Sequence, residues 1–268
     1  MINNLKEVMK QTVVTFRRCC LPVVGINIGL FILTFILIFI TLIILGKDFI
    51  SGLAALSINP ASVGDILPQL GIFFVSLLVI FALFYFASVW LLLVIKNNAL
   101  TGKSLFKSSF FEACRKIWKV LLWGIILFLA FLLVGTILGF ILGKYFAFLF
   151  IPVVLVCVPC IYTTSFGMMF LDGSFTSILS QSFTLGIKKW GRILITYLAS
   201  VIILFICLRL SGLVQSIWVK VGFATIGKLS NVVINMFVQA FAFCFFTVFY
   251  LNTAGVTAPS NEEQIPQK

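Results

Sequence analysis

Histidine is absent from the 268-residue sequence, and aspartate and glutamate together number only seven. Without histidine the chain lacks the commonest general base, the commonest metal ligand and the usual side chain that titrates near neutral pH. The seven carboxylates are scattered along the chain, so neither paired-carboxylate hydrolysis nor a carboxylate metal site is expected. The composition therefore predicts a protein that is not an enzyme and that binds no metal or cofactor.

Charge of either sign is also scarce, since charged residues make up 10% of the chain and hydrophobic residues 62%. A soluble domain is about 45–50% apolar and about 25% charged, and even a large one leaves much of its surface in water. No water-soluble core could bury this much apolar surface. We therefore expect an all-α integral membrane protein, because helices satisfy their own backbone hydrogen bonds in hydrocarbon.

Six apolar runs are each long enough to cross a bilayer, which takes about 20 helical residues. They cover residues 21–45, 70–95, 120–143, 145–171, 192–214 and 231–252. The first run is too long for a cleaved signal peptide and no small-x-small cleavage site follows it. We predict a single polytopic membrane domain over residues 1–252 and a disordered cytoplasmic tail over residues 253–268.

Basic residues are concentrated before the first run, between the second and third, and between the fourth and fifth. Under the positive-inside rule this distribution places both termini in the cytoplasm. The net charge of +12 is then a topology signal and an attraction to anionic lipid. Nucleic acid is not expected as a partner, because the cations lie next to the membrane. The candidate lipid-headgroup contacts are Arg17, Arg18, Arg115, Lys116, Lys119, Lys188, Lys189 and Arg192.

The three basic segments, residues 2–18, 104–119 and 174–190, share the pattern of an amphipathic helix. In the third, Phe175 begins an apolar stripe and Ser174 is the expected N-cap. Such helices are expected to lie in the headgroup layer with their cations toward lipid phosphate. We predict three transmembrane hairpins, each preceded by a cytoplasmic amphipathic surface helix. The alternative is that any short basic loop shows this pattern.

A family resemblance is visible in the third unit, which reads FIPVVLVCVPCIYTTSFGMMFLDGSFTSILSQSFTLGIKKWGRILITYLASVII. A proline-containing span, an acidic-Gly turn, an amphipathic helix and a basic-Trp cluster follow one another in it. This order resembles the membrane domain attached to some bacterial glycerophosphoryl diester phosphodiesterases, and related stand-alone, uncharacterised six-span bacterial membrane proteins. The resemblance implies a multi-pass protein of the bacterial cytoplasmic (inner) membrane. It does not imply phosphodiesterase activity, which in that family lies in a separate soluble domain with His and Glu residues.

Cys157 and Cys160 have the spacing of thiol–disulfide enzymes. They fall near the centre of the fourth predicted span, where the reactive thiolate would be poorly solvated. Packing is therefore the favoured interpretation, and Pro152 and Pro159 indicate a kinked helix there. An intramembrane thiol oxidoreductase is the alternative.

Arg209 lies inside the fifth predicted span and is a candidate intramembrane polar site. It either snorkels to the outer interface, about five residues away, or makes a buried contact. The glycines of residues 135–143 have GxxxG spacing, which allows close helix approach within the bundle or in a homo-oligomer. Asn27, Asn231, Asn235 and Gln239 could form hydrogen bonds between helices.

These features favour a non-enzymatic membrane protein that interacts with lipid, especially anionic lipid, or that serves as the membrane subunit of an envelope complex. A transporter or permease subunit is the alternative function, with a membrane-protein partner. The thiol oxidoreductase is the third hypothesis.

Overall fold

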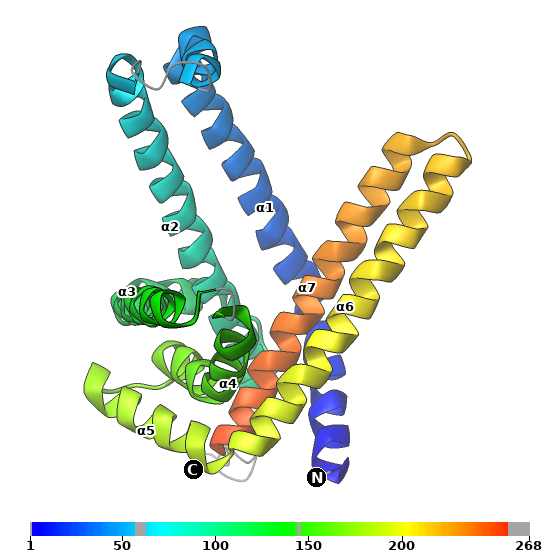
Figure 1. The fold of residues 1–268 in the computed structure, drawn as a ribbon. Helices are drawn as coiled ribbons and strands as arrows, with labels where there is room; N and C mark the ends of the chain where they lie inside the picture. Colours follow the sequence, from blue (N-terminus) through cyan, green and yellow to red (C-terminus); the bar gives the residue numbers. More distant parts are fainter. Residues whose placement is uncertain (1, 57–62, 144–145, 257–268) are drawn as a thin grey trace. The chain divides into compact units, whose positions relative to one another are not determined.

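The computed structural model describes residues 2–56, 63–143 and 146–256, and the regular structure within these ranges is helical (Figure 1). The helices are α1 (Ile2–Leu56), α2 (Val63–Thr101), α3 (Phe106–Leu142), α4 (Phe146–Phe170), α5 (Phe175–Lys188), α6 (Trp190–Lys220) and α7 (Ala224–Ala254). All except α5 are long and apolar enough to cross a membrane. The all-α class and six candidate membrane spans are thus confirmed.

Several helices are longer than the predicted spans. Helix α1 runs unbroken through the predicted surface helix at 2–18 and into the first span, and α3 likewise joins residues 106–119 to the third span. Only α5 is a separate helix, with Ser174 Oγ accepting a bond from the Ser177 amide as the predicted N-cap. The break expected before the first and second hairpins is therefore not seen.

The connections at the opposite ends of the helices also differ from prediction. The predicted spans end at residue 214 and resume at residue 231, whereas α6 continues to Lys220 and α7 begins at Ala224, so three residues connect the two helices. Within α1 the helical geometry is interrupted at Gly46, whose φ of 68° is accessible to glycine at little cost. Helix α7 extends to Ala254, and most of the predicted tail, residues 257–268, lies outside the described residues.

The chain divides into two compact units, where the sequence predicted one domain. One unit is Val23–Ser88, and the other combines Met1–Pro22 with Val89–Lys268. In the first unit, which holds parts of α1 and α2, large apolar side chains are turned outward, with Phe35 65% and Phe81 64% exposed. Apolar surface of this extent is typical of helices that face lipid.

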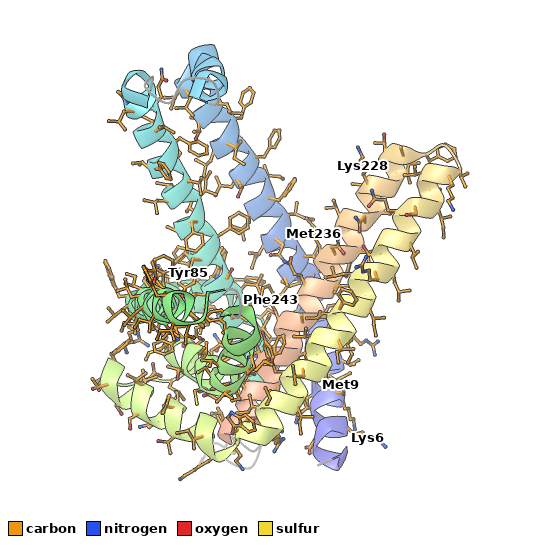
Figure 2. All side chains as sticks on the ribbon, in the orientation of Figure 1. Lys6, Met9, Tyr85, Lys228, Met236 and Phe243 are labelled. Carbon is orange, nitrogen blue, oxygen red and sulfur yellow. The ribbon has the colours of Figure 1, made fainter. Side chains whose placement is uncertain are left out.

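In the second unit, α3 packs against α4, α4 against α5, and α6 against α7. Figure 1 shows α6 and α7 side by side across the view, while α3 is seen nearly along its axis. Figure 2 shows how densely side chains surround these helices. Helices α1 and α2 pack little against each other, and α3 is not parallel to α6 in Figure 1. The arrangement of three transmembrane hairpins therefore remains a prediction.

Aromatic rings join α4 to the C-terminal half of α7. The ring of Phe166 lies 4.7 Å from that of Tyr162 and 5.6 Å from that of Tyr250, centroid to centroid. The Tyr162 hydroxyl donates to the Phe246 carbonyl at 2.7 Å, which satisfies a polar group that is otherwise buried. This aromatic core therefore holds the end of α7 against the end of α4.

Close helix approach occurs at glycines outside the predicted GxxxG ladder. A β-carbon at Gly186 of α5 would lie 2.8 Å from the Cys160 Cα of α4, and one at Gly167 would collide with the Ser182 side chain. At Gly135 and Gly139, by contrast, a β-carbon would meet no described atom within 4 Å. Close helix approach within the bundle is therefore not seen at these two glycines, and it is α5 that is held tightly against α4.

A polar cluster joins α6 to α7 near their connected ends. Ser211 Oγ donates to the side-chain oxygens of Asn231 and Asn235, the latter at 2.9 Å, and Asn231 Nδ2 donates to Gln215 Oε1 at 2.6 Å. The predicted interhelical hydrogen bonds of these two asparagines are confirmed. Such bonds fix the register of two helices that are otherwise apolar.

Candidate membrane-interface site

The cationic residues singled out from the sequence lie mainly at one end of the larger unit. The start of α1, the end of α2 and the last turns of α7 meet there, since residues from all three line one pocket. The α2–α3 and α4–α5 connections are also joined there through ion pairs. The side of the membrane on which these segments lie remains a prediction.

Lys116 is buried within a network of ion pairs, although the sequence made it a candidate headgroup contact. Its side chain is 2% exposed, and its Nζ lies 2.9 Å from Glu112 Oε1 and 3.2 Å from Asp172 Oδ1. The Nζ has no hydrogen bond of good geometry, so the attraction is chiefly between charges. Lys116 is therefore unavailable to lipid and instead ties α3 to the α4–α5 turn.

Lys96 completes the network from α2. Its Nζ donates to Glu112 Oε1 at 2.9 Å and to the Phe170 carbonyl at 3.3 Å. A cation at the last carbonyls of α4 is favourable, because these carbonyls form the negative end of the helix dipole. One carboxylate, Glu112, thus holds two lysines from different helices.

Asp172 occupies the outer edge of the same network. Burial raises the pKa of this carboxyl, but contact with Lys116 and the charges of Lys96 and Arg115 outweigh burial, so the pKa lies below its usual value. Arg115 is mostly exposed and its Nη2 is 3.7 Å from Asp172 Oδ1, a distance at which an exposed pair contributes little. Arg115 therefore keeps its capacity to bind a headgroup.

The remaining predicted contacts are engaged to different degrees. Lys119 Nζ donates to the Gly173 carbonyl, and Arg192 is half-buried beside Phe249. Arg17, Lys188 and Lys189 are exposed, and no ion pair involves them within the described ranges. These three cations are therefore available to contact lipid.

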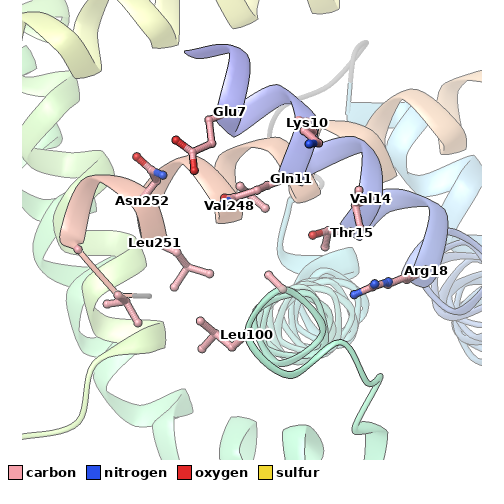
Figure 3. A pocket seen from close by; sticks show the side chains of 13 residues that line it. Glu7, Lys10, Gln11, Val14, Thr15, Arg18, Leu100, Val248, Leu251 and Asn252 are labelled. Carbon is pink, nitrogen blue, oxygen red and sulfur yellow. The ribbon is translucent and has the colours of Figure 1, made fainter. Parts of the chain in front are cut away.

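A polar pocket of about 440 Å³ lies among α1, α2 and α7 (Figure 3). Figure 3 shows Glu7 near Asn252 at one end of it and Arg18 at the other. A β-carbon at Gly102 would lie 3.1 Å from Arg18 Nη1, so this guanidinium reaches the C-terminal end of α2. Arg18 is therefore an exposed cation that lines the pocket and lies close to the α2 terminus.

Arg209 is exposed on α6, with its guanidinium 5.0 Å from the Phe205 ring centroid. Because α6 ends at Lys220 rather than at residue 214, Arg209 lies eleven residues from that end, about 16 Å along the helix. The cation–π contact provides the Arg209 charge with a favourable partner, Phe205, on the same helix.

Cys157 and Cys160 are both free thiols. They line an apolar pocket of about 370 Å³ between α3 and α4, together with Trp123, Phe150 and Phe183. Nearby, the Trp190 indole donates to the Val156 carbonyl at 2.9 Å, next to the carbonyl that Pro159 deprives of its helical donor. The surroundings suit packing, and within the described chain no group of three or more Cys, Asp or Glu side chains is placed to hold a metal ion.

The ion-pair network was missed by sequence reasoning, although one signal for it was present. Glu112 and Lys116 are four residues apart, the spacing at which a carboxylate and a lysine meet on a helix. Lys96 and Asp172 could not be added, because their proximity to Glu112 depends on how α2 and α4 pack.

Comparisons with protein-family models, with curated proteins and with solved structures find no match to this chain. The class to which the structure assigns it is a multi-pass membrane protein with six candidate membrane-spanning helices.

Proposed function

We propose that the chain is a non-enzymatic protein of the bacterial inner membrane that binds anionic lipid headgroups at its cytoplasmic side. Both termini would be cytoplasmic, as the distribution of basic residues predicts. The resemblance to the membrane domain of glycerophosphoryl diester phosphodiesterases supports the location. Lipid organisation, or service as the membrane subunit of an envelope complex, would follow from this binding.

The observation that carries the proposal is the arrangement at the α5–α6 junction. Lys188 and Lys189 are exposed and adjoin Trp190, and the preceding Phe183 and Ile187 are 48% and 58% exposed. Cations beside exposed apolar side chains are the combination that interfacial helices use to bind anionic membranes. Because α5 is held against α4 at Gly186, this surface is presented in a fixed position.

The alternative of a transporter or permease subunit receives less support. The pocket of about 470 Å³ along the middle of α6 and α7 is lined mainly by apolar side chains, with Asn235 and Gln239 among them. The pocket lined by Lys10, Arg18 and Glu7 lies at the helix ends. A pocket at that level suits contact with headgroups or with a small polar solute from the cytoplasm. It does not by itself provide a path across hydrocarbon.

Charge reversal at the junction tests the proposal. The full chain is extracted from membranes in polymer-bounded nanodiscs, and the ratio of anionic to zwitterionic phospholipid around it is measured by mass spectrometry. Lys188→Glu with Lys189→Glu should reduce anionic-lipid enrichment on the order of tenfold, because each cation near a membrane surface contributes about 1 kcal/mol.

Lys228→Glu, at the start of α7 and far along the chain from this junction, is the matched control and should leave the ratio unchanged. An unchanged ratio in the double variant would reject anionic-lipid binding at this surface. A thermal melt of each variant verifies that it remains folded.

A further inference from the structure

A groove of about 330 Å³ runs along α6 and begins at Arg192, three residues after the exposed Lys188 and Lys189 pair. Its lining residues on α6 are Arg192, Ile195, Thr196, Ala199, Ser200 and Ile203, and Val8, Met9, Phe245 and Phe249 complete it. The α6 residues recur at the spacing of a single helical face. The volume falls within the range of about 300–1,000 Å³ that is typical of ligand pockets.

The groove is apolar in effect, although two of its residues carry hydroxyls. Ser200 Oγ donates to the Thr196 carbonyl at 2.7 Å, so this hydroxyl is satisfied within its own helix. Phe245 and Phe249 are buried beneath the groove, whereas Ile195 and Ile203 are 57% and 55% exposed along it. An apolar chain could therefore enter the groove sideways from the bilayer.

The length of the groove matches one leaflet. From Arg192 to Ile203 the α6 face extends over eleven residues, about 16 Å. This is about half of the ~30 Å hydrocarbon core. The groove therefore accommodates a chain that begins at one membrane surface and ends near the midplane.

Arg192 marks the headgroup end of the groove. Its guanidinium lies 6.0 Å from the Phe249 ring centroid, and its Nη2 makes a long hydrogen bond of 3.4 Å to Asn252 Oδ1. No acidic group pairs with it in the part of the chain that the structure describes. Most donors of the guanidinium are thus free for a phosphate, which arginine binds through two parallel hydrogen bonds.

We propose that this groove is a specific site for one phospholipid of the inner leaflet. One acyl chain lies along α6 against Ala199, and the phosphate is bound by Arg192. The assignment rests on the membrane topology of the proposed function, but it concerns a single retained lipid rather than the surrounding anionic lipid. Val8 and Met9 also line the site, so the bound lipid would join the N-terminal segment of α1 to α6.

The test is the amount of phospholipid that stays with the full chain after extensive washing in detergent, measured by native mass spectrometry. The parent protein should retain one phospholipid. Ala199→Phe, which fills the groove without changing charge, should reduce the retained lipid at least tenfold. Ile202→Phe, on an exposed neighbouring position outside the groove, should leave it unchanged.

Arg192→Gln should weaken lipid retention and remove its dependence on the phosphate. In this variant a dialkylglycerol, which has no phosphate, should compete for the groove as well as phosphatidylglycerol does. Lys188→Glu with Lys189→Glu should leave the retained lipid in place, even if it changes the surrounding lipid. The two sets of variants therefore distinguish lipid retained in the groove from anionic lipid bound at the Lys188 and Lys189 surface. Equal retention by Ala199→Phe and the parent, or occupation of the groove by detergent or by a second copy of the chain, would overturn the assignment.

Discussion

Replacing Glu112 with glutamine should destabilise the protein far more than replacing its buried partner Lys116 with methionine. Glu112 Oε1 lies 2.9 Å from both Lys96 Nζ and Lys116 Nζ. Its loss would leave Lys96 without a carboxylate and Lys116 with Asp172 alone, although the two lysine side chains are only 13% and 2% exposed. Removal of one partner from a buried ion pair costs about 3–5 kcal/mol. Partial exposure of Glu112 lowers our expectation to about 2–4 kcal/mol.

Lys116→Met should cost less than about 1 kcal/mol, because methionine has a similar length and Glu112 keeps its contact with Lys96. The combination Glu112→Gln with Lys116→Met should therefore be more stable than Glu112→Gln alone. The free energy of unfolding is measured by SDS titration in mixed micelles, with far-UV circular dichroism as the signal. Equal costs for the two single changes, or no recovery in the double variant, would refute the network as a stabilising unit.

Three further perturbations test other contacts, each by the same unfolding measurement. Gly186→Val should destabilise strongly, because its β-carbon would come within 2.8 Å of the α4 backbone, whereas an equally stable variant would show that α5 is not held there. Asn231→Leu should cost about 1 kcal/mol by removing the hydrogen bonds to Ser211 and Gln215, and no loss would contradict the polar cluster. The lowered pKa of Asp172 means that its stabilising contact with Lys116 is present above the usual aspartate pKa of about 3.9 and is lost as the pH falls through the lowered value. The difference between the parent and Asp172→Asn should thus be constant near neutral pH and vanish in acid, and a difference that persists in acid would disagree.

Composition and hydropathy were sufficient to predict the all-α class and the six candidate spans. The prediction depends only on long local runs of apolar residues. Such runs lie in lipid, where an unpaired backbone group is costly, and a helix pairs all of its backbone groups internally. Ser174 was predictable for a similar reason, since N-capping involves atoms only three residues apart. The hydrogen bonds of Asn231 were predictable because a polar side chain in hydrocarbon is stabilised by a hydrogen bond to another polar side chain.

What the sequence could not predict was which helices approach closely. The glycines near residue 135 carry the more conspicuous motif, yet the close helix contacts are made at Gly167, Gly186 and Gly227. A glycine permits close approach but does not select the partner. Lys116 was misassigned for the same reason. A lysine of this kind is buried only if a neighbouring turn provides a carboxylate, and here that carboxylate belongs to Asp172, which is 56 positions further along the chain.

The extended length of α6 and α7 has a consequence for the bilayer that contains them. Each helix has 31 residues, about 46 Å when fully helical, against about 40–45 Å for a bilayer with its headgroup regions. A tilt that confined them to the ~30 Å core would be near 50°, beyond the range seen for membrane helices. The apolar residues at the connected ends of α6 and α7, with Ile217 62% and Val221 63% exposed, are therefore sensitive to hydrophobic mismatch. Lipids with longer acyl chains should cover these ends and favour the folded α6–α7 hairpin.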